Sequence, residues 1–308
     1  MNALSVKDLT KVYDNKFKAL SGISFSIAEG DFFALLGPNG AGKSTTIGII
    51  SSLVNKTSGE VQVFGQSLDQ RPDLVKKYIG LVPQEFNFNI FEKVHNIIMQ
   101  QAGYYGMRYQ KAKKNTDQLL HTLGLWEKRN EIARNLSGGM KRRLMIARAM
   151  VHEPRLLILD EPTAGVDVEI RHSMWDFIKK INEDGTTIIL TTHYLEEVEE
   201  LCKNVAIIDK GKILTNTSLK NLLTRLDKQS FILDLETPVQ IPPASDQIRF
   251  KQIDSQTLEV EIPKNMMINE IFSLLNQEKI SISSMRSKSN RIESLFLDLI
   301  QGNHNGHN

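Results

Sequence analysis

Three short segments of the chain carry residues suited to binding and cleaving a phosphate chain. GPNGAGKS at residues 37–44 has the spacing G-x-x-x-x-G-K-[ST], in which glycines let successive backbone amides point at phosphate oxygens. LSGG at residues 136–139 places a hydroxyl and two glycine amides at the start of an apolar helix, which makes a second anion-binding surface. LLILDEP at residues 156–162 ends an apolar run in two adjacent carboxylates. Together the segments predict the hydrolysis of a nucleoside triphosphate.

The first segment lies between a predicted strand and a predicted helix, which is the context that a phosphate-binding loop requires. We expect Lys43 to reach the β- and γ-phosphates, Ser44 to ligate Mg²⁺ and Thr45 to contact the α-phosphate. The loop alone leaves the nucleotide and the reaction open, because small GTPases and nucleoside kinases use it too. The residues expected to contact the nucleotide here are Gly37, Pro38, Asn39, Gly40, Ala41, Gly42, Lys43, Ser44 and Thr45.

The two carboxylates of the third segment have different tasks, because successive strand residues point to opposite faces. Asp160 fits the acid that holds Mg²⁺ through a water, and Glu161 is placed to polarise the attacking water as a general base. The alternative is a solvated pair of acids at a strand end. The LSGG segment between Lys43 and this pair favours the catalytic interpretation.

The second segment, with Ser137, Gly138 and Gly139, gives one chain two half-sites for a single phosphate chain. That arrangement predicts a nucleotide site that is completed between two copies of the chain.

The elements that must position these residues follow an α/β pattern. Continuous apolar runs at 32–36, 156–159, 187–190 and 205–209 read as strands covered on both faces, and 43–53 reads as a helix. We therefore predict an α/β fold, a phosphate-loop nucleoside triphosphatase core with a mainly parallel sheet, over residues 1–217. Strand patterns disappear after Gln84, and the segments 91–103 and 111–125 have helical spacing. These helices predict a helical subdomain inserted at about residues 85–150.

A change of pattern at residue 218 predicts a second, small α+β domain over residues 218–301. Residues 257–262 alternate polar and apolar, which places Leu258, Val260 and Ile262 on one face of a strand. Apolar residues at helical spacing between 268 and 275 and between 292 and 299 predict two helices, and 238–246 reads as a loop. The polar, glycine-rich residues 302–308 are expected to form a disordered tail.

The composition narrows the classes of partner. The 38 basic and 36 acidic residues give a net charge of +2, without the basic footprint of a nucleic-acid-binding protein, so no nucleic acid is expected. We expect Lys141–Arg143 to form a solvated helix face. The single cysteine fits a reducing cytosol. No apolar run reaches the roughly 18 residues that cross a bilayer, so any membrane path would be supplied by another chain.

With these motifs in this order, residues 4–215 resemble the ATP-binding subunits of ABC transporters. The resemblance implies that Gln84 reaches Mg²⁺ or the attacking water, that His193 contacts the γ-phosphate, and that Asp167 pairs across the dimer. It also implies that Tyr13 stacks on adenine, with Phe17 as a nearby competitor. Met140 departs from the family, in which glutamine is commoner after LSGG. Because Ser137 and the glycine amides can bind phosphate without it, we expect activity to survive.

The resemblance further implies two copies that face head to tail around two ATP and Mg²⁺, beside a separate integral membrane permease subunit. The runs PQEFNFN, QAGYYG and LSGGMKRRLMIARAM resemble bacterial exporters of the ABC-2 type, which predicts a peripheral ATPase on the cytoplasmic face of the cell membrane. The competing hypothesis is a soluble ABC ATPase that acts on a macromolecular complex. The cargo, and the role of the second domain, cannot be predicted from this chain.

Overall fold

The chain forms two compact units, one of Met1–Thr217 and one that begins at Ser218. The structure, a computed structural model, describes residues 1–163, 166–224, 228–238, 248–263, 266–278 and 280–287. Each unit is described by itself.

The central sheet of the first unit has the strand order β10-β9-β3-β8-β7-β6. The neighbours β9, β3, β8, β7 and β6 run parallel to one another. Every residue of β3 and β8 is buried, as expected for strands covered on both faces. The predicted α/β class is therefore confirmed. The strands are β3 (Phe32–Leu36), β6 (Ile79–Val82), β7 (Leu156–Asp160), β8 (Thr187–Thr191), β9 (Asn204–Asp209) and β10 (Lys212–Ser218).

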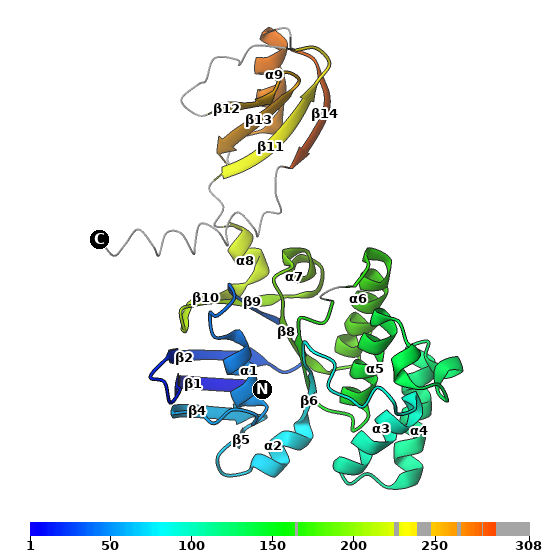
Figure 1. The fold of residues 1–308 in the computed structure, drawn as a ribbon. Helices are drawn as coiled ribbons and strands as arrows, with labels where there is room; N and C mark the ends of the chain where they lie inside the picture. Colours follow the sequence, from blue (N-terminus) through cyan, green and yellow to red (C-terminus); the bar gives the residue numbers. More distant parts are fainter. Residues whose placement is uncertain (164–165, 225–227, 239–247, 264–265, 279, 288–308) are drawn as a thin grey trace. The chain divides into compact units, whose positions relative to one another are not determined.

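Residues of the predicted site come at or just after the carboxyl ends of these parallel strands, so they lie at one edge of the sheet. The strands are labelled in Figure 1. The phosphate loop follows β3 and leads into helix α1 (Lys43–Ile50). Asp160 ends β7 and pairs in register with Thr191 at the end of β8. Gln84 comes two residues after β6 ends. Helix α1 is shorter than the predicted 43–53, because Ser52 has a φ of 62°, which lies outside the helical region.

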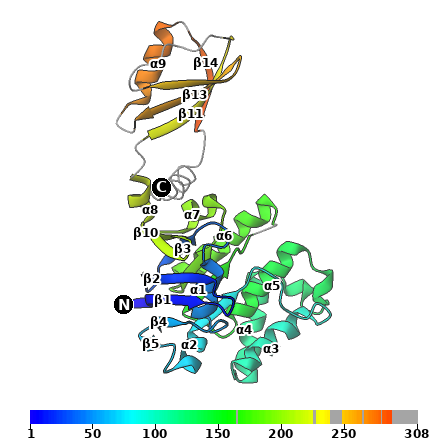
Figure 2. The same cartoon turned by 60° about the vertical axis from the view of Figure 1, so that its left-hand side comes forward.

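A second sheet is antiparallel and has the order β2-β1-β4-β5 (Figure 2). We did not predict this sheet from the sequence. Its buried apolar side chains form one core with α1 and the central sheet. Phe25 of β2, for example, stacks on Phe33 of β3 with ring centroids 5.9 Å apart. The strands are β1 (Asn2–Val12), β2 (Lys18–Ala28), β4 (Ser58–Val63) and β5 (Gln66–Ser67).

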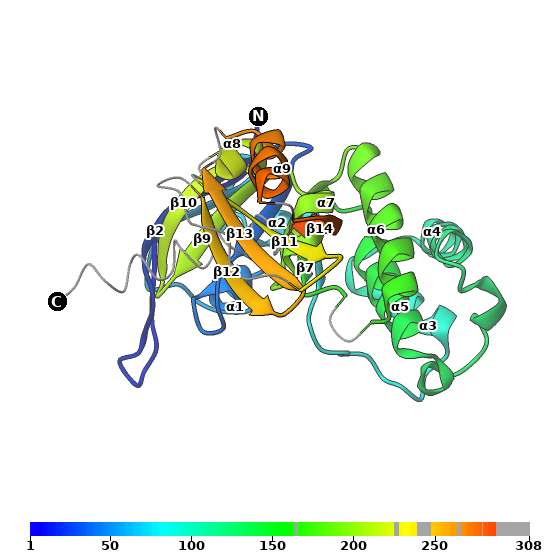
Figure 3. The same ribbon diagram turned by 90° about the horizontal axis from the view of Figure 1, so that it is seen from above.

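The predicted helical insertion is present and has its own apolar core (Figure 3). Helices α3 (Val94–Tyr104), α4 (Tyr109–Thr122) and α5 (Gly138–Met150) pack on one another. The other α-helices described in this unit are α2 (Pro72–Tyr78), α6 (Val168–Glu183) and α7 (Leu195–Leu201), and two short 3-10 helices lie at Trp126–Lys128 and Ala133–Asn135. No helix within the described residues is both long and apolar enough to span a bilayer.

The second unit is an antiparallel sheet of order β12-β13-β11-β14. Leu258, Val260 and Ile262 are all buried in its core, as their alternation predicted. Helix α9 contributes Ile271 and Leu275 to the same core. The predicted helix at 292–299, the tail at 302–308 and all but the first residue of the predicted loop at 238–246 lie outside the described residues. The elements are α8 (Leu219–Thr224), β11 (Lys228–Leu235), β12 (Arg249–Asp254), β13 (Thr257–Pro263), α9 (Ile268–Gln277) and β14 (Ile282–Ser287).

Candidate active site

The phosphate loop is shaped by backbone positions that only glycine tolerates. A Cβ on Gly37 would lie 2.2 Å from the carbonyl oxygen of Ile208, so no larger residue fits. Gly42 has a φ of 113° and starts α1 without a side-chain cap. The first amides of α1 are therefore not occupied by a capping side chain, and the positive end of the helix faces the loop. Together these features support an anion-binding cradle.

Lys43 lies over this loop with its side chain largely buried. Its Nζ donates hydrogen bonds to the carbonyl oxygens of Gly37 (2.6 Å) and Pro38 (3.1 Å). Burial lowers the pKa of the Lys43 ammonium, and the carboxylates of Glu161 and Asp160 oppose that effect. The three groups thus interact electrostatically, with a cation at the phosphate loop and two anions beside it. Ser44 is exposed at the same helix end.

The carboxylate of Glu161 contacts two other predicted catalytic residues, Gln84 and His193. Its Oε2 accepts a hydrogen bond from Nε2 of Gln84 at 3.2 Å, and its Oε1 lies 3.2 Å from Nδ1 of His193. Only 9% of Glu161 is exposed, and its φ of 48° places a residue other than glycine in the left-handed region. The backbone amide donates to the carbonyl oxygen of Thr191 at 2.9 Å, which helps to hold this conformation. Backbone strain of this kind is concentrated at functional sites.

Asp160 faces a different neighbour from Glu161. Because Glu161 lies beyond the end of β7 with a φ of 48°, this difference does not follow from strand alternation. Its carboxylate accepts a hydrogen bond from the hydroxyl of Thr191. Burial raises the pKa of the Asp160 carboxyl, and the hydrogen bond from Thr191 opposes that rise. The hydroxyl of Ser44, the amide oxygen of Gln84 and the carboxylate of Asp160 form a set of oxygen donors, which suits Mg²⁺. The residue types therefore fit the predicted metal.

Tyr13 and Phe17 lie on one turn between β1 and β2. The hydroxyl of Tyr13 lies 3.3 Å from the hydroxyl of Thr45, which ties its ring to the phosphate-binding segment. The amide of Tyr13 donates to the carbonyl oxygen of Phe17 at 2.9 Å. Both rings are accessible, with 37% of Tyr13 and 55% of Phe17 exposed. The contact with Thr45 favours Tyr13 as the residue nearer the nucleotide.

The LSGG segment lies apart from these groups in the contacts of the described chain. Ser137 caps α5 and accepts a hydrogen bond from the amide of Met140 at 3.3 Å, so its hydroxyl hydrogen is still available to a ligand. Ser137 and Gly138 are exposed, whereas Gly139 packs against Ile170, whose Cγ2 would lie 2.7 Å from an added Cβ. Asp167 is exposed at the start of α6.

The basic cluster at the start of α5 is not the solvated face that we expected. Arg142 is only 3% exposed, and its guanidinium donates to the carbonyl oxygens of Pro83 (3.0 Å) and Gln84 (2.9 Å). The prediction failed because the side chain turns inward to carbonyl groups at a distant position in the sequence, which helical spacing does not reveal. Thr191 was also missed, although a hydroxyl residue at the end of the strand beside β7 was a usable signal.

Comparisons with known proteins point to one family. A family model described as ABC transporter matches residues 20–164. The linearmycin resistance ATP-binding protein LnrL of Bacillus subtilis is 36% identical over 304 residues, which cover 96% of this chain and 97% of that protein. The Nod factor export ATP-binding protein I of Rhizobium etli is 37% identical over 226 residues, covering 73% and 71% of the two chains.

Solved structures align with about 70% of the chain. An ATP-binding cassette in a dimeric, post-hydrolysis state with ADP and phosphate has 27% identity and a TM-score of 0.64, covering 70% of this chain and 98% of that one. An ATP-binding subunit of an ABC transporter has 28% identity and a TM-score of 0.66, covering 72% and 92%.

Proposed function

The chain belongs to the ATP-binding subunits of ABC transporters, and from this we propose that it drives export through a separate ABC-2 type membrane subunit. Members of the family hydrolyse ATP, and a structural relative forms a dimer with ADP and phosphate bound. The names of the relatives mention linearmycin resistance and Nod factor export, which supports export over import for this chain. In this proposal the chain lies peripherally on the cytoplasmic face of the cell membrane.

The single observation that carries the catalytic assignment is the convergence of Gln84 and His193 on Glu161. A carboxylate held on both sides is oriented, and a mostly buried carboxylate can take the proton of an attacking water. Lys43 places a positive charge at the loop that would hold the phosphates. Phosphoryl transfer to water depends mainly on such positioning and on charge stabilisation. Mg²⁺, held by Ser44, Gln84 and Asp160, would add further charge stabilisation.

The exposed Ser137 and Gly138 support completion of each site by a second copy. Their hydroxyl and amide groups are accessible and have no contact with the phosphate loop of their own chain among the described hydrogen bonds. In the proposed dimer they contact the γ-phosphate held by the partner's loop. ATP then bridges the two copies, and hydrolysis removes the bridge, so the two states differ in their contacts.

The first experiment replaces Glu161 with glutamine, which keeps the shape but removes the base. We expect ATP affinity to stay within about twofold, turnover to fall by about 10²–10⁴-fold, and ATP with Mg²⁺ to trap a dimer, seen by size-exclusion chromatography with light scattering. Glu29→Gln, at an exposed carboxylate that pairs with Arg155, is the matched control and should behave as the unaltered chain. Turnover at the normal rate in Glu161→Gln would remove Glu161 from this role.

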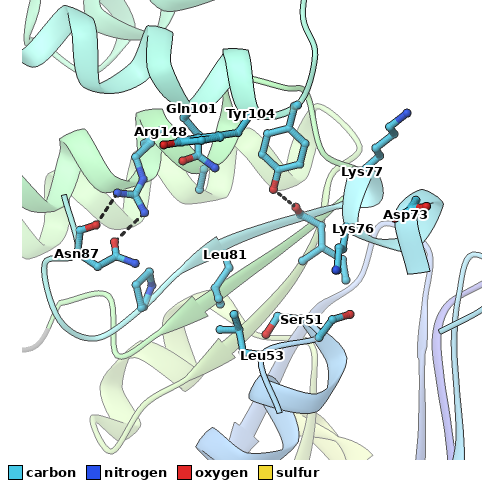
Figure 4. A pocket seen from close by; sticks show the side chains of 15 residues that line it. Ser51, Leu53, Asp73, Lys76, Lys77, Leu81, Asn87, Gln101, Tyr104 and Arg148 are labelled. Carbon is cyan, nitrogen blue, oxygen red and sulfur yellow. Dashed lines mark hydrogen bonds between the residues drawn. The ribbon is translucent and has the colours of Figure 1, made fainter. Parts of the chain in front are cut away.

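A groove of about 760 Å³ supports the docking of the membrane subunit on the first unit (Figure 4). Its walls come from both parts of that unit: the segment after α1 and helix α2 on one side, and α3 and α5 on the other. Leu53 and Tyr104 are 72% and 86% exposed there, and Lys76 and Lys77 are exposed on α2. We propose that it receives a partner segment with an apolar anchor and acidic side chains.

Asn87 links this groove to the active site, so an occupant of the groove could affect the catalytic residues. It lines the groove and lies three residues after Gln84, whose amide donates to Glu161. An occupant that moved this segment would move Gln84 toward or away from Glu161.

The test of docking is a charge reversal, Lys76→Glu with Lys77→Glu. We expect it to abolish co-purification with the membrane subunit from detergent-solubilised membranes, while the hydrolysis rate of the chain alone stays within about twofold. Reversal of the exposed Lys113 and Lys114 on α4, outside the groove, is the control. Retention of the permease by the α2 variant would contradict the docking site. Drug susceptibility of cells that lack the chain would test the export proposal separately.

A further inference from the structure

Arg142 joins the helix that begins with the LSGG segment to the loop that carries Gln84. It lies on the second turn of α5, and its two terminal nitrogens donate to the consecutive carbonyl oxygens of Pro83 and Gln84 at 3.0 and 2.9 Å. Its guanidinium carbon lies 5.1 Å from the centroid of the Phe86 ring. Hydrogen bonds from a charged donor are among the stronger ones in proteins. The residue therefore holds the backbone of this loop at two consecutive positions and also contacts the side chain of Phe86.

The same side chain lies beside the catalytic carboxylates. Burial lowers the pKa of the Arg142 guanidinium, and the negative charges of Asp160 and Glu161 oppose that effect. An arginine stays charged even so. Arg142 thus holds the backbone of Gln84, while the side chain of Gln84 donates to Glu161 at 3.2 Å. Its described hydrogen bonds go to the loop of Gln84 and not to the phosphate loop, so we expect its effect to pass through Gln84 and through charge.

The neighbouring arginines show that this contact is specific. Arg143 points elsewhere and donates to the hydroxyl of Ser173 at 2.9 Å. Arg148, one and a half turns further along α5, donates to the carbonyl and side-chain oxygens of Asn87 at 3.1 and 2.7 Å. Two side chains of one helix therefore hold the loop of residues 83–87, and Arg142 holds its catalytic end.

We infer that Arg142 is a positioning residue that couples the two ATP sites of the dimer. The inference rests on the proposed function, in which Ser137 and Gly138 contact the ATP held by the partner. A 13-residue helix moves as a rigid element. Engagement of its first turn by the partner's ATP is passed by Arg142 to Gln84, and hence to the carboxylate of the chain's own site. Each site is then set for hydrolysis by occupancy of the other.

The test compares Arg142→Lys with Arg143→Lys in the full chain. Lysine keeps the positive charge but lacks the planar guanidinium group, whose two terminal nitrogens donate to the two carbonyl oxygens. For Arg142→Lys we expect nucleotide affinity, measured with a fluorescent ATP analogue, within about twofold of the unaltered chain. We expect kcat to fall about tenfold and the Hill coefficient for ATP to fall from near 2 toward 1. Arg143→Lys should keep the Hill coefficient of the unaltered chain.

A double-mutant cycle with Gln84→Ala separates this role from a general loss of stability. If Arg142 acts through Gln84, Arg142→Lys should change kcat by less than about twofold in the Gln84→Ala background. Additive losses, or an unchanged Hill coefficient in Arg142→Lys, would overturn the inference. Non-cooperative hydrolysis by the unaltered chain would overturn it as well. Absence of any ATP hydrolysis by the unaltered chain would instead refute the proposed function.

Discussion

His152 makes the first unit sensitive to acid, and it contacts Ile79 and Tyr105, two residues that line the groove. It follows α5 closely, and its Nε2 lies 3.0 Å from the carbonyl oxygen of Ile79, which a neutral ring with a hydrogen on Nε2 satisfies. The ring stacks on Tyr105 with centroids 3.6 Å apart and an angle of 6° between the planes. Its Nδ1 is buried and has no hydrogen-bond partner among the described residues. A proton added there would have no acceptor, and burial lowers the pKa of His152 to about 4.

The direction of the effect follows from this pKa. Because the folded value of about 4 lies below the unfolded value of about 6.5, the unfolded chain binds more protons between these two pH values. Stability is therefore full above about pH 6.5 and falls as the pH drops toward 4. At pH 5 the loss from this one group is about 2 kcal/mol, taking 1.36 kcal/mol per pKa unit.

The substitution His152→Gln isolates the contribution of His152 to the pH dependence of stability. The glutamine amide can donate to the carbonyl oxygen of Ile79 and does not titrate. Both tryptophans, Trp126 and Trp175, lie in the first unit, so tryptophan fluorescence during urea unfolding reports on that unit alone. Between pH 7.5 and 5 the unaltered chain should lose about 2 kcal/mol more than the variant. That difference corresponds to a midpoint shift larger by roughly 0.5–1 M urea.

The matched control is His172→Gln, at an exposed histidine of α6. Its midpoint should fall with pH as far as that of the unaltered chain. Loss of stacking on Tyr105 will lower the midpoint of His152→Gln at every pH, so the comparison uses the change between the two pH values. If His152→Gln and the unaltered chain lose equal stability on acidification, the buried, neutral His152 is refuted.

Three further substitutions test the active site. Lys43→Ala should weaken ATP binding by about 10²-fold, since a charge-assisted contact to phosphate is lost; an equilibrium titration measures this, and unaltered affinity would exclude the contact. Gly139→Val should prevent formation of the ATP-trapped dimer, measured by light scattering, while each chain still binds ATP. The valine side chain would displace Ile170 and the start of α5. A normal amount of dimer would contradict this prediction. Thr191→Val removes the hydroxyl that donates to Asp160, so the Mg²⁺ concentration for half-maximal hydrolysis should rise several-fold; an unchanged requirement would show that the hydroxyl is dispensable.

Local patterns predicted the elements that need only near neighbours in the sequence. The buried strand β3 and the start of α1 follow from an apolar run and a glycine-rich loop, and the alternation of Leu258 and Val260 predicted β13. The separate antiparallel sheet was missed although its strands also alternate, as Ile23, Phe25 and Ile27 of β2 show. Alternation identifies a strand but does not identify its partners, and β1 pairs with β4 across more than 40 intervening residues.

The active site was predictable in its residue types but not in its contacts. Motif order pointed to Gln84, Glu161 and His193, whereas their convergence depends on three different strand ends meeting at one sheet edge. The left-handed backbone of Glu161 could not be predicted either, because a glutamate gives no signal of positive φ. Arg142 was misjudged because a basic run on a helix is usually solvated, and only the tertiary fold brings carbonyl groups of the β6 loop to it.

The strained backbone of Glu161 and the inward-pointing side chain of Arg142 both help to bring Gln84 and Glu161 together. With φ at 48°, the chain turns sharply after Asp160, and the Glu161 side chain meets the amide of Gln84. Gln84 can donate to it only while its own backbone is held, and Arg142 provides that hold from a helix whose first turn is exposed to a second copy. A carboxylate fixed directly by its own strand would need no such chain of contacts. The contacts run through a loop that also borders the groove, because Pro83 and Asn87 line that groove. Occupancy of either surface can therefore alter the orientation of the base, which couples the rate of hydrolysis to the partners of the chain.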